Sequence, residues 1–183
     1  MRYFAWVGIV AAGSLVWAAQ QESQKTPTPQ KEHALLKAFE GEWDGTCTQT
    51  PDPNKPAVES KFRETSKMSL GGFWLITEFK GEMEGKTVEG HGVMGYDPLK
   101  RKYVTTWVDS MWPHLFVAEG DADASGKRLT FMGEMIDPAT QKPVKEKLVF
   151  DLGESDARTL VFYKIGSDGK ETKAGEVRYT RCK

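Results

Sequence analysis

Ten runs of alternating polar and apolar residues constrain the fold of this chain more than any other feature. The runs cover residues 42–50, 58–69, 73–81, 86–96, 102–111, 115–123, 127–136, 144–152, 158–165 and 171–181. The alternation breaks at residues typical of turns, namely Gly71-Gly72, Asp97-Pro98, Ser125-Gly126, Asp137-Pro138, Gly153 and Asp168-Gly169. Because no helical pattern separates these evenly spaced runs, the sequence predicts an all-β fold, either an antiparallel up-and-down barrel of about ten strands or a sandwich.

The first and last runs favour the barrel. If they pair antiparallel with Trp43 opposite Arg181, then Gly45 lies opposite Tyr179, and each strand has one mostly apolar face and one polar face. A guanidinium stacked on an indole contributes about 0.5–2 kcal/mol. We therefore expect Trp43 and Arg181 to close one end of the barrel as structural residues, without a role in ligand binding.

A short amphipathic helix is expected before the first strand. Leu35, Leu36 and Phe39 recur at helical spacing within residues 31–39. Gly41 follows directly and is a residue type that ends helices. The sequence therefore predicts one N-terminal helix ahead of an otherwise all-β chain.

The first 18 residues have the pattern of an export signal. Arg2 supplies a positive charge, an apolar run follows, and small residues precede the cleavage point at Ala18. The run is shorter than the roughly 20 apolar residues of a membrane span, so we expect no stable span after processing; an uncleaved anchor is the alternative. Residues 19–30 resemble a disordered, proline-spaced linker, which leaves 31–183 as one domain. These features predict a periplasmic or secreted protein.

The charge balance argues against a nucleic-acid partner. The chain has 25 Lys and Arg against 26 Asp and Glu, a formal net charge of −1 at pH 7. Binding to nucleic acid or to an anionic membrane surface typically requires a basic patch or stripe. We therefore expect no nucleic-acid partner.

The two cysteines are on the terminal strands. Export would favour a disulfide between Cys47 and Cys182. The Trp43–Arg181 register, however, leaves them about five residues out of step, which is too far for the Cα separation of 4.4–6.8 Å that a disulfide requires. The register therefore argues against a bridge, with frayed ends or an intermolecular link as the alternatives.

Five segments extend the interpretation to a family. They are Gly41-Glu42-Trp43, Gly71-Gly72-Phe73-Trp74, Gly90-His91-Gly92-Val93-Met94-Gly95-Tyr96-Asp97-Pro98, Thr106-Trp107-Val108-Asp109-Ser110-Met111 and Tyr179-Thr180-Arg181. The Gly-x-Trp segment and the late arginine resemble the calycin group of lipocalins and fatty-acid-binding proteins. Together the five resemble the bacterial family named domain of unknown function 1579 (DUF1579), over roughly residues 33–181. The resemblance implies a calycin-like, lipocalin-like barrel and no particular activity, since fold does not define function.

The middle strands contain a cluster of ionisable and aromatic residues. If the hairpin at Asp97-Pro98 places His91 opposite Trp107, then Asp109 is a diagonal neighbour of His91, and Tyr103 shares their face. A shift of one residue would send these side chains to opposite faces. If their face points inward, His91, Trp107 and Asp109 line a cavity; if the other face does, His91 and Asp109 are solvated and the interior is apolar. The alternation leaves both arrangements open.

Further acids interrupt otherwise apolar strand faces, and Glu78 and Glu134 are the main examples. A buried acid costs several kcal/mol unless it is paired, so an inward position would indicate a functional site or a polar network. An outward or strand-end position is the alternative for each. The ligand-binding candidates inside the barrel are His91, Trp107, Asp109, Glu78, Glu134 and Tyr103.

Motifs for metal, haem or catalysis are weak or absent. A metal site would use His91 with Asp109 and Glu134 or Glu78, and a haem site would use His91 or His114. The chain has only three histidines, without a His-x-His or His-Glu-x-x-His spacing or a haem attachment motif. It also lacks a Gly-x-Ser-x-Gly nucleophile motif. The sequence therefore implies no cofactor and identifies no catalytic residue.

Three functions remain open from the sequence. An exported barrel that binds a small apolar or aromatic ligand is favoured, because barrels of this size commonly enclose one small molecule. A barrel filled by its own side chains, with a structural or partner-binding role, is the first alternative. An enzyme that uses His91 as acid or base with Asp109 or Glu134 is the second. The sequence does not define the ligand or the oligomeric state.

Overall fold

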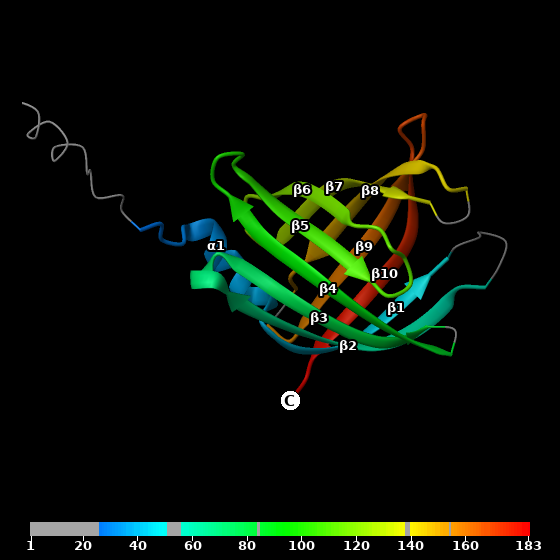
Figure 1. The fold of residues 1–183 in the computed structure, drawn as a ribbon, viewed down its shortest axis with the longest axis horizontal. Coiled ribbons are helices and arrows are strands. Elements are labelled where there is room, and N and C mark those ends of the chain that lie inside the picture. Colours follow the sequence, from blue (N-terminus) through cyan, green and yellow to red (C-terminus); the bar gives the residue numbers. More distant parts are fainter. Residues whose placement is uncertain (1–25, 51–55, 84, 138–139, 154) are drawn as a thin grey trace, which may run out of the picture.

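The computed structural model describes residues 26–50, 56–83, 85–137, 140–153 and 155–183. Its elements are α1 (Lys31–Leu36) with the 3-10 turn η1 (Lys37–Phe39), β1 (Gly41–Gln49), β2 (Val58–Ser69), the 3-10 turn η2 (Leu70–Gly72), β3 (Trp74–Met83), β4 (Lys86–Asp97), β5 (Lys102–Asp109), β6 (Phe116–Ala122), β7 (Arg128–Ile136), β8 (Pro143–Asp151), β9 (Ala157–Ile165) and β10 (Glu171–Arg181) (Figure 1). The predicted export signal and most of the predicted linker lie outside the described residues.

The ten strands form one closed antiparallel barrel. Each strand pairs with its neighbours in sequence, and β1 closes the barrel against β10. Trp43 pairs with Arg181 and Gly45 with Tyr179. The predicted all-β barrel with a short N-terminal helix is therefore confirmed, and the sandwich is excluded.

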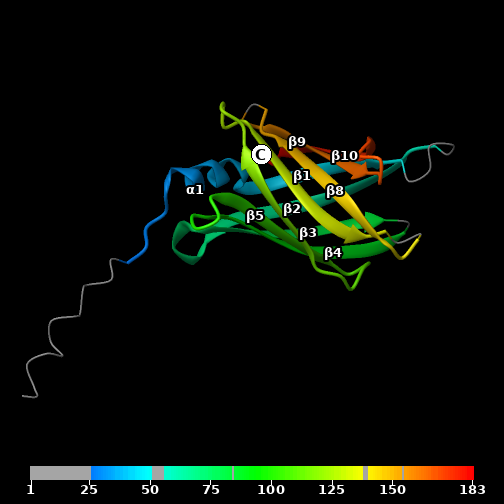
Figure 2. The same ribbon diagram turned by 90° about the horizontal axis from the view of Figure 1, so that it is seen from above.

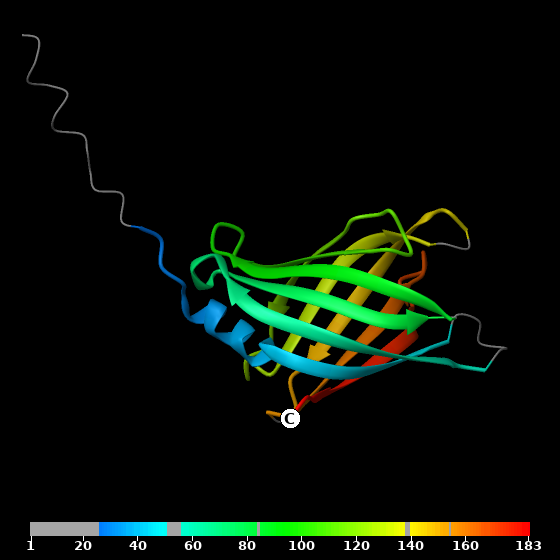
Figure 3. The ribbon, with the colours of Figure 1, turned by 60° about the horizontal axis from the view of Figure 1, so that its bottom comes forward.

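The two ends of the barrel differ in what covers them. Helix α1 packs beside β3 and β4 at one end, which we call the α1 end (Figures 2 and 3). Leu36 and Phe39 are buried there, and the Tyr103 hydroxyl donates a hydrogen bond to the Glu32 carbonyl over 3.1 Å. Strands β4, β6, β8 and β10 begin at the opposite end of the barrel, which we call the far end.

Arginine and aromatic side chains fill the α1 end. The Arg181 guanidinium lies 4.2 Å from the Trp43 ring centroid, and its Nη1 donates to the Glu40 carbonyl over 2.7 Å. A second arginine, Arg158, lies 4.3 Å from the same ring. The Trp43 indole nitrogen donates to the Phe39 carbonyl over 3.0 Å, so the tryptophan is fixed on several sides.

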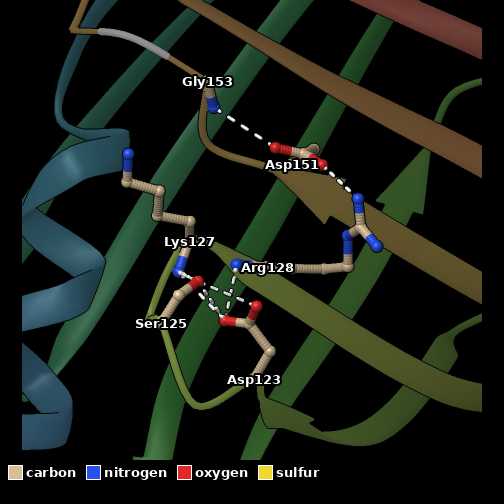
Figure 4. A network of polar contacts seen from close by, with 6 residues as sticks. All are labelled: Asp123, Ser125, Lys127, Arg128, Asp151 and Gly153. Carbon is tan, nitrogen blue, oxygen red and sulfur yellow. Dashed lines mark hydrogen bonds and ion pairs between the residues drawn. The ribbon is translucent and has the colours of Figure 1, made fainter.

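The β6–β7 turn at the α1 end is held by carboxylates (Figure 4). Asp123 accepts hydrogen bonds from the Ser125 hydroxyl over 2.8 Å and from the Lys127 amide over 3.1 Å, and these bonds lower its pKa. Arg128 at the start of β7 reaches Asp151 at the end of β8 over 2.6 Å. These contacts fix the β6–β7 turn and tie it to the neighbouring strand.

Both cysteine thiols are free, in agreement with the argument against a bridge. Cys47 pairs with Val177 and is buried, and burial raises the pKa of its thiol to about 11. Cys182 is partly exposed beside Asp44 on the outer face, and its backbone amide donates to the Glu42 carbonyl. The two sulfurs therefore lie on opposite faces of the barrel wall.

Candidate functional site

The β4–β5 register differs by one residue from the prediction. Trp107 pairs with Gly92 and His91 pairs with Val108. The turn causes this difference, because Asp97 continues β4 and Arg101 belongs to the turn with a left-handed φ of 55°. The expected pairing of His91 with Trp107 is therefore wrong, and these two side chains lie on opposite faces.

The predicted site residues separate into two groups. His91 and Glu78 are cross-strand neighbours on the outer face and are exposed. Glu134 is likewise exposed on the outer face of β7, where Leu129 and Phe131 point inward. Trp107, Asp109 and Tyr103 belong to the inner face of β5 (their positions alternate with outward Val104 and Val108). The structure thus does not bring together the six candidates in one site.

Tyr103 belongs to the α1 end. Its ring is buried against Tyr96 at 5.1 Å between centroids, and its hydroxyl is bonded to helix α1. Burial, followed by the charge of Glu32, raises its pKa to about 12. These contacts make Tyr103 part of the packing of the helix onto the barrel.

Asp109 orients Trp107 at the far end. One carboxylate oxygen accepts the Trp107 indole N–H over 3.0 Å, and the other accepts the backbone amides of Met111 and Trp112 over 2.8 and 3.0 Å. Asp109 thereby connects an inner-face ring to the start of the β5–β6 loop. Its hydrogen-bonding capacity is largely used within the protein, so we assign it a positioning role.

Three inner aromatic rings lie directly over glycines of neighbouring strands. A Cβ atom at Gly90 would lie 2.5 Å from Trp107 Cζ2, and one at Gly133 would lie 2.8 Å from Phe116 Cε2. Phe62 covers Gly45 in the same way, at 2.2 Å. Such distances are far below van der Waals contact. Each ring therefore occupies the space of a missing side chain and lies against the barrel wall.

The far half of the interior is more accessible than the α1 half. Its aromatic rings are half-buried, namely Phe79, Trp107, Phe116 and Phe162. Phe79 packs edge-on against Trp107 at 5.7 Å between centroids and against Phe62 at 4.6 Å. By contrast, the largest fully buried side chains include Phe39 and Trp43 at the α1 end. An aromatic inner wall thus becomes partly exposed toward the far end.

Sequence reasoning missed an ionisable group on this wall. Glu146 shares the inner face of β8 with Leu148 and pairs with Gly133 on one side and Lys164 on the other. Burial raises its pKa to about 7, against a smaller lowering by the charge of Lys164. The alternation of Val144, Glu146 and Leu148 in the sequence was the signal available for finding it.

A second missed group is an ion pair at the α1 end. Arg158 on β9 donates to Glu64 on β2, and both residues are buried, with exposed fractions of 3% and 6%. Glu64 also accepts the Ser66 hydroxyl over 2.9 Å. Arg158 lies 4.4 Å from the Tyr179 ring centroid. This network satisfies the buried carboxylate, and we regard it as structural.

Two hollows lie elsewhere on the described surface. One of about 510 Å³ is on the outside of β1, β2 and β10, and most of its lining is polar or charged: Asp44, Gly45, Thr46, Thr48, Glu59, Lys61, Phe62, Arg178 and Thr180. The other, of about 200 Å³, is at the α1 end beside Trp43, Arg158 and Arg181. The arginines there already bind backbone carbonyls.

Among the described residues, no group of three or more His, Cys, Asp or Glu is placed to hold a metal ion. No helix in the described part of the chain is long and apolar enough to cross a membrane. The residues that a metal site would have used lie on opposite sides of the sheet, because His91 and Glu78 are outside and Asp109 is inside.

Comparison with known proteins agrees with the barrel. The profile of a family described as "Protein of unknown function (DUF1579)" matches residues 28–181. No curated protein matches the chain in sequence. Among solved structures, the S-type phycobiliprotein lyase CPES from Guillardia theta has a TM-score of 0.54 at 15% identity, covering 85% of this chain and 99% of that one. Rv2717c from M. tuberculosis has a TM-score of 0.57 at 11% identity, covering 84% and 99%. At these identities the likeness concerns the fold.

Proposed function

This chain belongs to the family described as protein of unknown function (DUF1579), and we propose that it binds a small apolar or aromatic molecule in the far half of its calycin-like barrel. The ligand enters from the far end and lies against the half-buried rings of Phe79, Trp107 and Phe116. Barrels of this size commonly hold one small ligand.

One observation carries this proposal: aromatic rings lie over glycines at Gly90 and Gly133. An ordinary residue at Gly90 would push Trp107 toward the barrel axis, and one at Gly133 would clash with both the Phe116 ring and the Val117 carbonyl oxygen. With glycine there, the rings form part of the wall and present their free faces to the interior. An aromatic surface that is half-exposed and held in place suits stacking with a flat apolar ligand.

The similarity to a phycobiliprotein lyase is consistent with this proposal. That protein is named a phycobiliprotein lyase, and the structural similarity covers 99% of its chain. For the present chain we propose only that a small molecule binds inside the barrel, and we do not propose that it has the lyase activity.

We further propose that the protein acts outside the cytoplasm. The basic, apolar and small-residue pattern of residues 1–18 supports cleavage after Ala18. Expression of the full chain in a bacterial host, followed by intact mass measurement of the periplasmic fraction, tests this. A mature chain that begins near Ala19 supports export, whereas a full-length chain confined to the cytoplasm contradicts it.

The binding proposal is tested with the neutral dye N-phenyl-1-naphthylamine, whose fluorescence rises in apolar surroundings. We expect saturable binding to the wild-type protein. Gly90→Ala displaces Trp107 into the interior and should weaken dye binding at least tenfold, equivalent to about 1.4 kcal/mol. Native mass spectrometry of the purified protein then identifies any natural ligand that is retained.

Gly95→Ala is the matched control. A Cβ at Gly95 would lie 2.3 Å from Trp74 Cε3, a clash of the same kind, but Trp74 lies on the outer face of β3. We expect this variant to keep wild-type dye affinity. Absence of dye binding to the wild type, or equal weakening by the two substitutions, would instead favour a barrel filled by its own side chains.

A further inference from the structure

Glu146 is an acidic residue on the otherwise mostly apolar inner face of the barrel. It points to the inner face of β8, next to Leu148 of the core, and the residue opposite it on β7 is Gly133. Because glycine has no side chain, nothing covers Glu146 from that strand. The Phe116 ring lies over Gly133. The Glu146 carboxyl therefore adjoins the aromatic surface proposed above as the ligand site.

The cation that faces Glu146 from the neighbouring strand is already engaged. Lys164 is its cross-strand neighbour on β9, but the Lys164 ammonium forms an ion pair with Asp137 over 2.6 Å. The Asp137 side chain is only 15% exposed, so this pair is partly shielded from solvent. Within the part of the chain that the structure describes, the Glu146 carboxyl has no hydrogen-bond partner.

The charge of Glu146 is therefore only partly compensated, because the Lys164 ammonium that faces it is also paired with Asp137. A carboxyl held half-buried without a partner is costly, and a cationic hydrogen-bond donor would remove that cost.

From this arrangement we infer that the ligand carries an amine beside its aromatic or apolar body, and that Glu146 binds the ammonium group. This inference rests on the proposed function, since it names the ligand class for the same site. The ring of the ligand lies against Trp107 and Phe116, and its nitrogen donates to the Glu146 carboxylate. Glu146 is then the residue that selects cationic over neutral or anionic ligands.

Three probes with the same ring isolate the role of charge. They are 1-naphthylmethylamine, 1-naphthylmethanol and 1-naphthylacetate, and their affinities are measured by titration calorimetry at pH 8. We expect the wild-type protein to bind the amine at least tenfold more tightly than the alcohol and to bind the acetate most weakly. Charge-assisted hydrogen bonds are roughly twice as strong as neutral ones, in line with such a preference.

Substitution of Glu146 tests the residue itself. Glu146→Gln keeps the shape of the side chain and removes its charge, and it should reduce the preference for the amine to less than about twofold. Glu134→Gln is the control, because Glu134 lies on the neighbouring strand but is exposed on the outer face. That variant should keep the full preference.

The pH dependence supplies a second readout. Between pH 6 and 8 the Glu146 carboxyl ionises, since its pKa is about 7, while the amine probe stays protonated. Affinity for the amine should therefore increase over this range in the wild type and stay constant in Glu146→Gln. The titratable groups that face Glu146 are Lys164 on β9 and Asp137, which follows β7 and is paired with Lys164. Gly133 has no side chain that could titrate.

The outcomes separate the two proposals. If the neutral dye binds but the amine has no advantage over the alcohol, or if Glu146→Gln retains that advantage, the inference is overturned and the proposed function stands. If neither the dye nor any naphthalene probe binds, both fail. Dye binding by Glu146→Gln also shows that the variant is folded, so a lost amine preference in it is due to the missing charge.

Discussion

Arg158 on β9 and Glu64 on β2 form an ion pair across the interior of the barrel, although β1 and β10 separate their strands in the sheet. The side chains are 3% and 8% exposed. Arg158 also donates to the Phe39 carbonyl over 3.1 Å. The pair thus joins the two sides of the wall to the segment that follows α1.

Breaking this pair from one side should destabilise the protein strongly. Arg158→Met leaves the Glu64 charge buried without its partner, which costs about 3–5 kcal/mol in comparable cases. We expect a loss of that size in the free energy of unfolding, measured by urea denaturation. The double variant Glu64→Leu/Arg158→Met removes both charges and should recover most of the loss.

An exposed pair on the same barrel is the control. Arg63 and Asp44 are 3.0 Å apart, with 60% and 61% of their side chains exposed. Surface pairs contribute about 0–1 kcal/mol, so Arg63→Met should change stability by no more than that. Equal losses from Arg158→Met and Arg63→Met would show that burial does not set the energy of the inner pair.

The strand pattern of the barrel could be predicted from the sequence because each strand has an inner and an outer face. The expected run at 58–69 coincides with β2, and the run at 171–181 with β10. The register of the terminal strands was also predictable. Trp43 is the first large inward residue of β1 and Arg181 is the last of β10, and only one alignment pairs them.

The β4–β5 register could not be obtained in the same way. β4 has glycine at positions 90 and 92, so its inner face is only weakly marked by apolar side chains. The register then depends on the length of the turn. Asp97 accepts hydrogen bonds from the amides of Leu99 and Lys100, and this four-residue turn is one residue longer than the alternation suggests.

The charged groups inside the barrel were hidden for a different reason. Glu64 and Arg158 are 94 residues apart in sequence, and two strands separate them in the sheet, so no local pattern links them. Glu146 follows the inward alternation of β8, but an acid at an inward position normally argues for a surface strand. Its position became clear only with the neighbouring Gly133 and Lys164.

Removal of the Asp109 carboxylate should loosen the far end. Asp109→Ala loses the bond to the Trp107 indole and leaves the amides of Met111 and Trp112 without their acceptor. We expect a loss of about 1–3 kcal/mol in the free energy of unfolding. Hydrogen exchange at those two amides should become faster. Asp109→Asn keeps an acceptor oxygen and should lose less than half as much.

A comparison with Asp121 separates loop anchoring from a general effect of charge. Asp121 forms an exposed pair with Lys102 over 2.5 Å. Asp121→Ala should leave the exchange rates of Met111 and Trp112 unchanged. If it accelerates them as much as Asp109→Ala does, the anchoring role of Asp109 is wrong.

The two thiols should differ sharply in reactivity. Burial raises the pKa of Cys47 to about 11, so little thiolate forms at pH 8 and the sulfur is also inaccessible. Cys182 lies partly exposed near the C-terminus. A disulfide reagent such as 5,5′-dithiobis(2-nitrobenzoate) should titrate one thiol rapidly in the native protein and two in denaturant. Cys182→Ser should remove the rapid phase, and a rapid phase that survives would show that Cys47 is accessible.

The raised pKa of Glu146 also predicts how stability depends on pH. The carboxyl binds a proton with a pKa of about 7 in the folded protein and with its ordinary value of 4.5 in the unfolded chain. Between these values the folded state binds more protons, so this group lowers stability as pH rises from about 5 to 8. The full effect is a few kcal/mol at most, from about 1.4 kcal/mol for each unit of pKa difference.

Urea denaturation of the wild type and of Glu146→Gln at pH 5, 6, 7 and 8 measures this contribution. Glutamine resembles the protonated carboxyl, so the two proteins should have similar stability at pH 5. At pH 8 the variant should be the more stable one, because the wild type must hold a buried charge. A constant difference between them at all four pH values would mean that Glu146 does not titrate in this range, and the amine preference should then be independent of pH as well.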